Sequence, residues 1–267
     1  MISFERRHTW NAVAAMRSFV ARLKRHTSLS TDDFDHLLAA LRLEVATVVS
    51  GVDVVRQGDR PRRSVFVLSG TLARYQTLAT GARQYISLHM AGDMPDLQCF
   101  MLGELDHSLE AVEESMVALA PHEQLKAVLL KSPAFAAALW RESLLDAAVV
   151  RQAVTTNGAR SSLERIAHLF CEHYVRNWQA GLTRDRTCDF PLNQSQVGQM
   201  LGLSIVTVNR LVRRLRHEGC AEVRGRRLLI RDWRKLRARA AFDPCYLQLD
   251  LTAGALSPPR RKPPLPA

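Results

Sequence analysis

The stretch that most constrains the fold of this chain is residues 193–219, NQSQVGQMLGLSIVTVNRLVRRLRHEG. Asn193 is a typical helix N-cap, because its side-chain oxygen can accept a hydrogen bond from a free amide of the first turn. Val197 and Leu201 follow at helical spacing, which predicts one apolar stripe. Gly202 comes directly after them, where a helix end favours a residue that tolerates positive φ. The stretch therefore begins with a short, capped helix.

A second helix is predicted immediately afterwards, with Ser204 as its N-cap and Gly219 as its stop. Its two faces differ in chemistry. The inward face carries Val208, Leu211, Val212 and Leu215, and the outward face carries Asn209, Arg210, Arg213, Arg214 and Arg216. Two short helices joined by a glycine turn, the second basic on its outside, form the helix-turn-helix pattern.

Residues 220–230 extend this pattern, since they predict a strand, a turn at Gly225 and a second strand, followed by a basic helix at 232–241. A strand pair in this place is the wing of a winged helix. The alternative is an ordinary helical hairpin with a solvated arginine face. Between Arg210 and Arg239, however, there are 12 Lys and Arg residues against three acidic ones, a net charge of +9 in a chain that carries +11. Nearly all the excess positive charge lies where phosphate binding needs it.

These observations predict that the segment binds double-stranded DNA. Arg213, Arg214 and the wing arginines are expected to hold phosphates, which positions a protein without specifying a base sequence. The candidate DNA contacts come from both helices and the wing, and they are Gln194, Ser195, Ser204, Ile205, Val206, Thr207, Asn209, Arg210, Arg213, Arg214, Arg224 and Arg226.

Composition limits the class of protein. With 267 residues, 47% of them hydrophobic, the chain can bury a core and is expected to form two domains. It has no apolar run of the ~18–20 residues that span a bilayer, and its basic N-terminus lacks the apolar block of a signal peptide. The five cysteines form no CxxC pair, which suits a reducing cytoplasm better than a disulfide framework. We therefore expect a cytoplasmic protein with no membrane partner.

Residues 1 to about 40 predict helices that pack on the next domain, with a membrane-surface role as the alternative. From about residue 43 to 120, short apolar stretches alternate with turn signals at intervals of roughly 10 residues, as in an antiparallel sandwich or jelly roll. Apolar residues alternate with Ser87 and His89 in one predicted strand, and residues 65–68 predict a buried strand. A barrel of this size is compatible with a ligand pocket. The turn signals are Gly51, Gly58-Asp59, Gly70, Gly81 and Gly92-Asp93.

A helix is predicted at 121–131, and Ser132-Pro133 begins a longer one. Mostly apolar residues recur along the longer helix at intervals of three and four, which is nearly a heptad seam. One side of this helix must cover the barrel, and we expect the seam to pair with the same helix of a second chain. A helix buried only within its own chain is the alternative. The seam consists of Ala136, Trp140, Leu144, Ala147, Arg151 and Val154, with Trp140, Leu144, Ala147 and Arg151 as the principal dimer contacts.

Asn157-Gly158 is expected to break the long helix and to form the hinge between domains. The predicted fold class is α+β, with an N-terminal antiparallel β jelly roll, a long dimerisation helix and a C-terminal winged helix-turn-helix. The predicted boundaries are 1–132 for the helical start and barrel, 133–157 for the dimerisation helix and 158–245 for the DNA-binding domain. Residues 246–267 form a basic, proline-rich tail that is expected to be disordered.

Several short motifs along this order of elements resemble those of one family. They are Gln57-Gly58-Asp59, Leu68-Ser69-Gly70 and Gly92-Asp93 in the barrel, and residues 196–204 and 207–210 in the helix-turn-helix. Over nearly the whole chain the sequence is similar to the cyclic-AMP receptor protein/FNR (Crp/Fnr) family of bacterial transcription regulators. The resemblance implies a homodimer on a palindromic operator, RNA polymerase as a partner, no catalytic activity, and a cyclic-nucleotide-binding-like barrel that gates DNA binding through an effector.

The barrel departs from the family where cyclic nucleotides bind. Members that bind them place a Gly-Glu pair, and an Arg-Ser or Arg-Thr pair, around the cyclic phosphate and the ribose. The corresponding positions here, counted without gaps, are Asp96, Leu97, His107 and Ser108. A carboxylate beside a phosphate costs Coulomb energy, so we expect no cyclic nucleotide. Any other effector is unknown, and its candidate pocket residues are Arg74, Asp96, His107 and Ser108.

Other cofactors are not expected either. The oxygen-sensing branch of the family holds an iron–sulfur cluster on N-terminal cysteines, and this chain has no cysteine before Cys99. His89 or His107 could ligate haem, but a lone barrel histidine is more often simply hydrogen-bonded. One face of a later helix offers a possible metal set, for which interhelical packing is the simpler interpretation. Its members are His168, Cys171 and Glu172.

The recognition helix also departs from the family. The usual Arg and Glu, which read guanine and cytosine edges, are replaced by Ile205 and Val206. Apolar side chains can contact thymine methyl groups, and Asn209 and Arg210 can pair with adenine and guanine. We therefore expect a half-site that differs from that of the cyclic-AMP receptor protein.

Two other functions stay open at this point. The protein could be an effector-independent DNA-binding regulator whose barrel is only a dimerisation scaffold, which the altered phosphate site favours. A cupin-type barrel enzyme is a remote alternative. It needs a His-x-His…Glu…His metal set, and His89, His107 and His122 lack that spacing.

Overall fold

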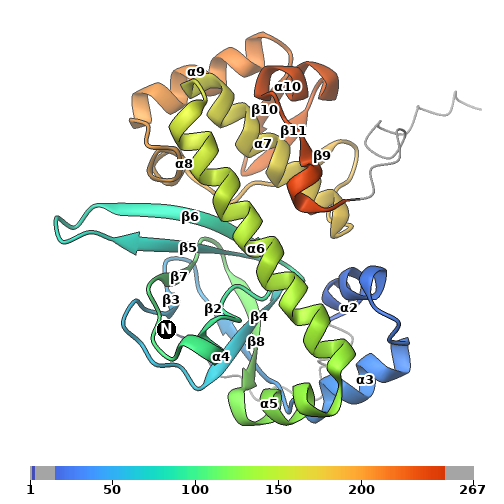
Figure 1. Ribbon diagram of the computed structural model, residues 1–267. Helices are drawn as coiled ribbons and strands as arrows, with labels where there is room; N and C mark the ends of the chain where they lie inside the picture. Colours follow the sequence, from blue (N-terminus) through green and yellow to red (C-terminus); the bar gives the residue numbers. More distant parts are fainter. Residues whose placement is uncertain (1, 4–15, 250–267) are drawn as a thin grey trace, which may run out of the picture.

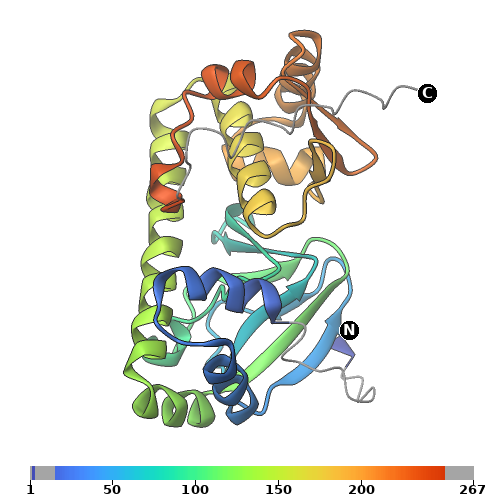
Figure 2. The same cartoon turned by 90° about the vertical axis from the view of Figure 1, so that its right-hand side faces the viewer.

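The computed structural model describes residues 2–3 and 16–249. A β-barrel and a mostly helical domain are joined by one long helix, α6, that runs along both of them (Figure 1). Figure 2 shows α6 at one edge of the molecule, with the two domains on the same side of it. This is the predicted α+β arrangement, and the described part of the chain contains no helix long and apolar enough to cross a membrane.

The barrel consists of two four-stranded antiparallel sheets, in the orders β1-β2-β8-β4 and β3-β7-β5-β6. The predicted jelly roll is therefore confirmed, and the glycines of all five predicted turns adopt positive φ. The strands are β1 Ile2–Ser3, β2 Glu44–Val48, β3 Asp53–Val55, β4 Arg63–Ser69, β5 Thr71–Thr77, β6 Arg83–Met90, β7 Ser108–Ala111 and β8 Ser115–Pro121.

One feature of β6 differs from the alternating pattern of the sequence. Ser87 and His89 are both buried, at 3% exposure, rather than solvated. The reason is that α6 and the following helix cover this face of the sheet, so both faces of the strand end are enclosed. Alternation in sequence reports a half-buried strand only when nothing packs on the second face.

Short helices from both ends of the barrel sequence and from one of its loops pack around the barrel. They are α2 Arg17–Leu23, a 3₁₀ turn at Lys24–His26, α3 Thr31–Ala40, α4 Cys99–Leu102 and α5 His122–Lys131. Phe19 of α2 meets Phe66 of β4 edge to face at 5.0 Å, and Phe34 of α3 meets Phe135 of α6 at 6.1 Å between centroids. The N-terminal helices thus pack on the barrel domain, as expected for the part that is described; the predicted apolar position Val13 lies outside the described residues.

Helix α6 spans Pro133–Ala159, so the predicted break at Asn157-Gly158 is wrong. Asn157 stays helical and donates its side-chain amide to Met200 O at 3.1 Å, which anchors this end of α6 to the helix-turn-helix. The chain turns two residues later, because Arg160 and Ser161 are extended and Ser161 forms a capping box with Glu164 at the start of the next helix. A glycine inside a helix costs about 1 kcal/mol relative to alanine, which is too little by itself to end a helix that other contacts hold.

The C-terminal domain has the predicted order of elements. Its three-stranded sheet has the order β10-β11-β9, so the wing gains a third strand that the sequence did not predict. Buried residues from every helix form one core, including Phe170, Val208, Leu215 and Leu236. The elements are α7 Ser162–Gln179, β9 Thr187–Asp189, α8 Gln194–Leu201, α9 Ile205–His217, β10 Ala221–Arg224, β11 Arg227–Ile230, α10 Trp233–Ala240 and the 3₁₀ turn η2 Pro244–Leu247.

The predicted start of the disordered tail at residue 246 is also wrong. The segment η2 lies against α6 (Figure 2), and Leu247 is buried. Tyr246 donates its hydroxyl to Glu172 at 2.5 Å and stacks on His168 at 6.1 Å between centroids. An aromatic side chain with a buried hydrogen-bond partner holds this segment in place. Residues 250–267 lie outside the described residues.

Candidate nucleic-acid interface

The helix-turn-helix is built as its caps and glycines predict. Asn193 Oδ1 accepts a hydrogen bond from Gln196 N at 2.9 Å, and Ser204 Oγ accepts one from Thr207 N at 3.2 Å. Gly202 has φ +64°, in the left-handed region. A Cβ on Gly198 would lie 2.5 Å from Leu203 O, so only glycine lets α8 approach the turn this closely.

The outward face of the recognition helix α9 is available for DNA. Val206 is 79% exposed and Ile205 53% exposed, although both are large apolar residues at the N-terminal end of the helix. Asn209 donates its amide to Gln194 Oε1 at 3.2 Å, which fixes its orientation across the two helices. Arg210 lies on the same exposed face. The structure therefore gathers most of the predicted DNA contacts on one surface.

Arginines beside this surface are grouped around two glutamates. Arg231 Nη2 lies 2.7 Å from Glu222 Oε2, and Arg216 Nε lies 3.4 Å from Glu222 Oε1. Arg224 Nε also pairs with Glu222, whose pKa is lowered chiefly by the hydrogen bond from Arg231. Glu218 in turn pairs with Arg214 at 2.8 Å. Neither Arg216 nor Arg231 is among the predicted DNA contacts. The sequence predicts Arg216 on the outward helix face, but only the fold shows that Arg231 lies beside it.

Arg226 takes a position that the sequence did not predict. Its guanidinium donates to Val112 O of the barrel at 3.2 Å and to Pro191 O at 3.0 Å. The wing turn at Gly225 and Arg226 has positive φ at both residues, 53° and 61°, which aims the side chain back at the barrel. In this arrangement Arg226 joins the two domains rather than facing DNA.

Asp96, expected to stand in a phosphate cradle, instead faces the barrel backbone. Its side chain is fully buried, and Oδ1 accepts a hydrogen bond from Val65 N at 2.7 Å. Burial raises the pKa of Asp96 to about 7. Asp96 is therefore bonded to β4 rather than open to a ligand, because α4 and its preceding turn fold this residue onto β4.

The other three candidate effector residues are also committed to protein partners. His107 Nδ1 lies 2.6 Å from Asp106 Oδ1, and burial lowers the pKa of His107. Ser108 Oγ accepts from Gln57 N at 3.0 Å. Arg74 is buried and donates to Asp146 Oδ2 of α6 at 2.8 Å and to Pro95 O. The positive charge of Arg74 acts to lower the pKa of both Asp96 and His107, although burial leaves the pKa of Asp96 raised. The structure thus brings these residues together, but Arg74 serves as a link from the barrel to α6.

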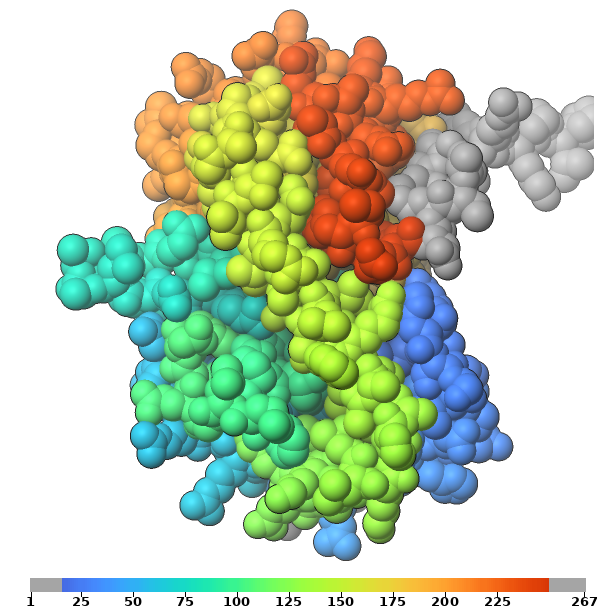
Figure 3. Space-filling view, viewed as in Figure 1, coloured from blue at the N-terminus to red at the C-terminus, as the bar shows by residue number. Residues whose placement is uncertain are grey.

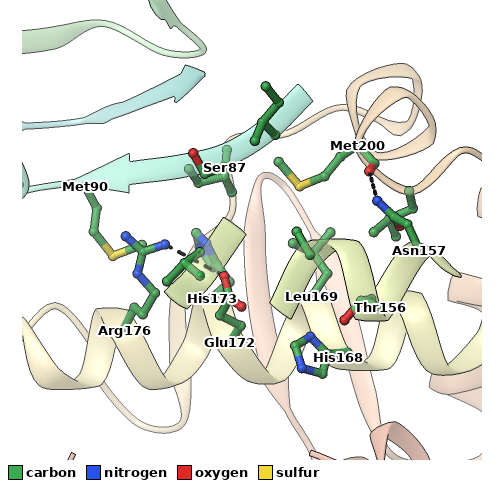
Figure 4. Close-up of a pocket in the computed structure, with 15 residues that line it drawn as sticks. Ser87, Met90, Thr156, Asn157, His168, Leu169, Glu172, His173, Arg176 and Met200 are labelled. Atoms are coloured by element: carbon green, nitrogen blue, oxygen red, sulfur yellow. Dashed lines mark hydrogen bonds and ion pairs between the residues drawn. The ribbon is translucent and has the colours of Figure 1, made fainter. Parts of the chain in front are cut away.

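A cavity of about 40 Å³ lies where the domains meet, between β6, α6, α7 and α8 (Figure 4). This volume is large enough for a few water molecules and too small for a nucleotide. Polar groups at its wall include Thr156 Oγ1, Asn157 Oδ1 and His173 Nδ1, which have no hydrogen-bond partner among the described residues. Burial lowers the pKa of His173 to about 4, so its ring is neutral at physiological pH.

The alternative metal and haem ligands are engaged elsewhere. His168 lies 3.3 Å from the Gln152 amide, Glu172 accepts from Tyr246, and Cys171 is buried in the core. His89 shares a hydrogen bond with Ser87 at 2.9 Å. Within residues 2–3 and 16–249, no group of three or more His, Cys, Asp or Glu side chains is arranged to hold a metal ion.

A buried ionic cluster joins both domains to the long helix. Arg176 of α7 lies 2.8 Å from Asp93 Oδ2, and Arg22 of α2 pairs with Asp93 and, at 2.7 Å, with Glu142 of α6. Burial alone would raise the pKa of Asp93, but the Arg176 and Arg22 guanidiniums bring it down to about 2. In the sequence, Asp93 is only part of a turn signal, and no local pattern points to this cluster.

A cyclic-nucleotide-binding-type barrel joined by a long helix to a winged helix-turn-helix with an exposed recognition face defines a DNA-binding transcription regulator. Comparison with known families agrees for each part. Residues 47–132 match the cyclic nucleotide-binding domain, and residues 164–239 match the Crp-like helix-turn-helix domain. The chain belongs to the Crp/Fnr family.

Relatives of known description support the assignment. A probable transcriptional activator of Rhizobium leguminosarum bv. viciae is 24% identical over 184 residues, which are 68% of this chain and 75% of the relative. The fumarate and nitrate reduction regulatory protein of Vibrio cholerae is 24% identical over 183 residues, 68% of this chain and 73% of that protein. Among solved structures, FixK2 from Bradyrhizobium japonicum superimposes with a TM-score of 0.69 at 20% identity, covering 76% of this chain and all of that one. The last similarity shows the shared fold.

Proposed function

We propose that this Crp/Fnr-type regulator acts as a homodimer on a palindromic operator, in the cytoplasm and in partnership with RNA polymerase. The observation that carries the dimer is the outward face of α6. Trp140 is 70% exposed, Leu144 54% and Val154 70%, whereas Phe135, Leu139 and other residues on the opposite side are buried. Figure 3 shows α6 lying across the surface between the two domains.

A groove runs beside this apolar face and gives a second helix room to pack. It has a volume of about 480 Å³ and is bounded by α6 on one side and by the η2 segment on the other. Apolar side chains repeated at intervals of three and four favour a helix pair, because each can insert between side chains of the facing helix. The groove residues are Arg141, Leu144, Leu145, Ala148, Arg151, Gln152, Thr155, Tyr246 and Gln248.

In the proposed complex, a two-fold dimer presents its recognition helices to successive major grooves about one DNA turn apart. Ile205 and Val206 meet thymine methyl groups, and Arg210 meets a guanine. Asn209, held by Gln194, is oriented toward an adenine edge. Ile205 and Val206 are therefore expected not to make the guanine and cytosine contacts that Arg and Glu make at these two positions in other members of the family.

The first experiment is selection of randomised duplex DNA by the purified full-length protein. An enriched inverted repeat would support the proposal, and salt-sensitive binding without any repeat would contradict it. Arg210→Ala is expected to weaken binding to the selected repeat by about 1–3 kcal/mol, while its affinity for unrelated DNA changes far less.

Arg213→Ala is the matched comparison, because Arg213 lies on the same exposed face but is expected to contact phosphate. It should weaken binding to the repeat and to unrelated DNA by similar factors. Equal losses on both duplexes for Arg210→Ala would remove Arg210 from the base-reading set.

A second candidate, effector-independent DNA binding, is favoured by one observation. The Arg74 guanidinium, which lies in the candidate effector region, is already bonded to Asp146 and Pro95. Binding an anionic effector there would require breaking these contacts. We therefore expect cyclic AMP and cyclic GMP to leave the melting temperature unchanged in thermal-shift measurements. A rise with either nucleotide would instead support gating by an effector in the barrel.

A further inference from the structure

Three arginines from separate elements meet one buried carboxylate beside the recognition helix. Arg216 comes from the C-terminal turn of α9, Arg224 from the end of β10, and Arg231 from the residue after β11. All three pair with Glu222 of β10, whose side chain is only 3% exposed. Residues 7 to 15 positions apart in the sequence are thus brought to one point, between the recognition helix and the base of the wing.

The three guanidiniums remain open to solvent. Their side chains are 58%, 69% and 52% exposed for Arg216, Arg224 and Arg231. Each guanidinium has five N–H donors, and a single carboxylate can occupy only a few of the fifteen. Most of the donors are therefore free on the outer side of the cluster. Three guanidiniums and one carboxylate also leave the cluster with a net charge of about +2.

We propose that Glu222 is a positioning residue, which gathers Arg216, Arg224 and Arg231 into a clamp for a backbone phosphate of duplex DNA. Without the carboxylate, three cations at this spacing would repel one another and move apart into solvent. With it, their planar donors are held together in the geometry that suits a phosphate. The proposal rests on the proposed function only in requiring that the winged helix meets duplex DNA.

The clamp makes a prediction opposite in sign to simple electrostatics. A carboxylate near DNA ordinarily repels phosphates, so its neutralisation should strengthen binding to every duplex. If Glu222 instead holds the arginines in place, Glu222→Gln loses phosphate contacts although the protein becomes more positive. The sign of the change separates the two roles.

The test measures how DNA affinity depends on salt. Full-length wild type and Glu222→Gln are titrated with a labelled duplex of arbitrary sequence at several salt concentrations. The slope of log K against log salt is about −0.9 for each phosphate neutralised. Glu222→Gln is expected to show a slope shallower by about 1 to 2, with weaker binding at low salt. Tighter binding at an equal or steeper slope would overturn the proposal.

A matched control removes the same charge far from DNA. Glu104 of the barrel also pairs with an arginine, Arg60, at 2.9 Å, and Glu104→Gln should leave the slope unchanged. A shallower slope in both variants would mean that the effect is not specific to the clamp and would overturn it. Wild-type protein that shows no salt-sensitive binding would instead refute the proposed function itself.

A second variant protects the test against misfolding of Glu222→Gln, which thermal denaturation would reveal. Arg231→Gln changes a half-exposed side chain and should reduce the slope by about 0.9. Combining both changes should cost less than the sum of the two, because they disable one clamp. An unchanged slope in Arg231→Gln, or fully additive losses in a folded double variant, would exclude a shared phosphate site.

Discussion

At the scale of single residues, burial decides which chemistry a side chain retains. Asp96 and Asp93 lie three positions apart in one turn region and are both buried, yet the pKa of Asp96 is raised to about 7 and that of Asp93 is lowered to about 2. Asp96 is hydrogen-bonded only by the Val65 backbone and the Cys99 thiol, and the more distant charge of Arg74 does not offset its burial, whereas Asp93 forms ion pairs with two guanidiniums. The pKa values of two chemically identical side chains are thus shifted in opposite directions.

The raised pKa of Asp96 gives a pH dependence of known sign. From about pH 4, where the unfolded chain loses this proton, to about pH 7, where the folded protein does, stability should fall as pH rises. A shift of roughly three units corresponds to about 4 kcal/mol. Asp96→Asn keeps the acceptor for Val65 N and removes the ionisation. Urea unfolding should therefore show the variant gaining on the wild type between pH 4 and 7; parallel curves would contradict this.

Two glycines of the C-terminal half make a matched pair. Gly198→Ala places a Cβ 2.5 Å from Leu203 O and should cost about 1–3 kcal/mol of unfolding free energy. Gly158→Ala adds a Cβ with nothing within 4 Å, inside a helix, and should stabilise by about 0.5–1 kcal/mol. Denaturant unfolding of both variants checks the pair. Similar effects from the two substitutions would show that the contact with Leu203 is not limiting.

At the scale of elements, α6 serves two surfaces at once. Its inner side packs on the barrel through residues such as Phe135, Leu139 and Val149, and it carries Asp146 to Arg74. Its outer side presents the exposed seam. Near the C-terminal end of the same helix, Asn157 donates a hydrogen bond to Met200 O of the helix-turn-helix. A change in the barrel or at the proposed dimer seam would therefore reach the DNA-binding domain through contacts of a single helix.

The seam predicts the effect of one charge. Trp140→Glu places a carboxylate in the proposed helix–helix contact and should raise the dimer dissociation constant at least about tenfold, which is about 1.4 kcal/mol. Leu130→Glu makes a similar change at a residue of α5 that is 75% exposed but outside the seam, and it should leave the dimer intact. Sedimentation over a concentration series checks both. An unchanged mass for Trp140→Glu would place the dimer contact elsewhere.

At the scale of the whole molecule, the two domains are held in one arrangement by buried polar contacts. Asp93 ties α2 and α7 together, Glu142 adds α6, and Arg226 bonds the wing turn to the barrel. Buried ion pairs contribute little net energy when intact, but breaking one leaves charges without a partner. The arrangement of the domains should therefore be sensitive to single substitutions in this cluster.

Asp93→Asn tests that sensitivity. It leaves Arg22 and Arg176 without their shared carboxylate and should cost about 3–5 kcal/mol at neutral pH. Because the pKa of Asp93 is lowered to about 2, its contribution is present above about pH 4 and is lost as pH falls toward 2. Unfolding measurements should show the difference between wild type and variant shrinking over that range. Asp35→Asn, at an exposed residue of α3, is the control. A pH-independent difference in unfolding free energy between wild type and Asp93→Asn would contradict a stabilising role of the ionic cluster.

The sequence alone determined the elements whose signals are local. Caps such as Asn193 and Ser204, turn glycines such as Gly202, and apolar residues at helical spacing report backbone preferences within a few residues, so the helix-turn-helix, the wing and the jelly-roll turns could all be predicted. The concentration of positive charge in one segment likewise indicated the partner, because phosphate binding depends on charge density.

Only the tertiary structure decided which polar groups meet. Arg226 and Val112 are 114 residues apart, and Arg22 and Asp93 are 71 apart. No periodicity or cap links such positions. The structure therefore differs from the sequence prediction at the candidate effector residues, at Arg226 of the wing and at the end of α6. The physical reason is that a buried charge must find a partner wherever the fold supplies one, and that choice depends on packing in three dimensions rather than on neighbouring residues.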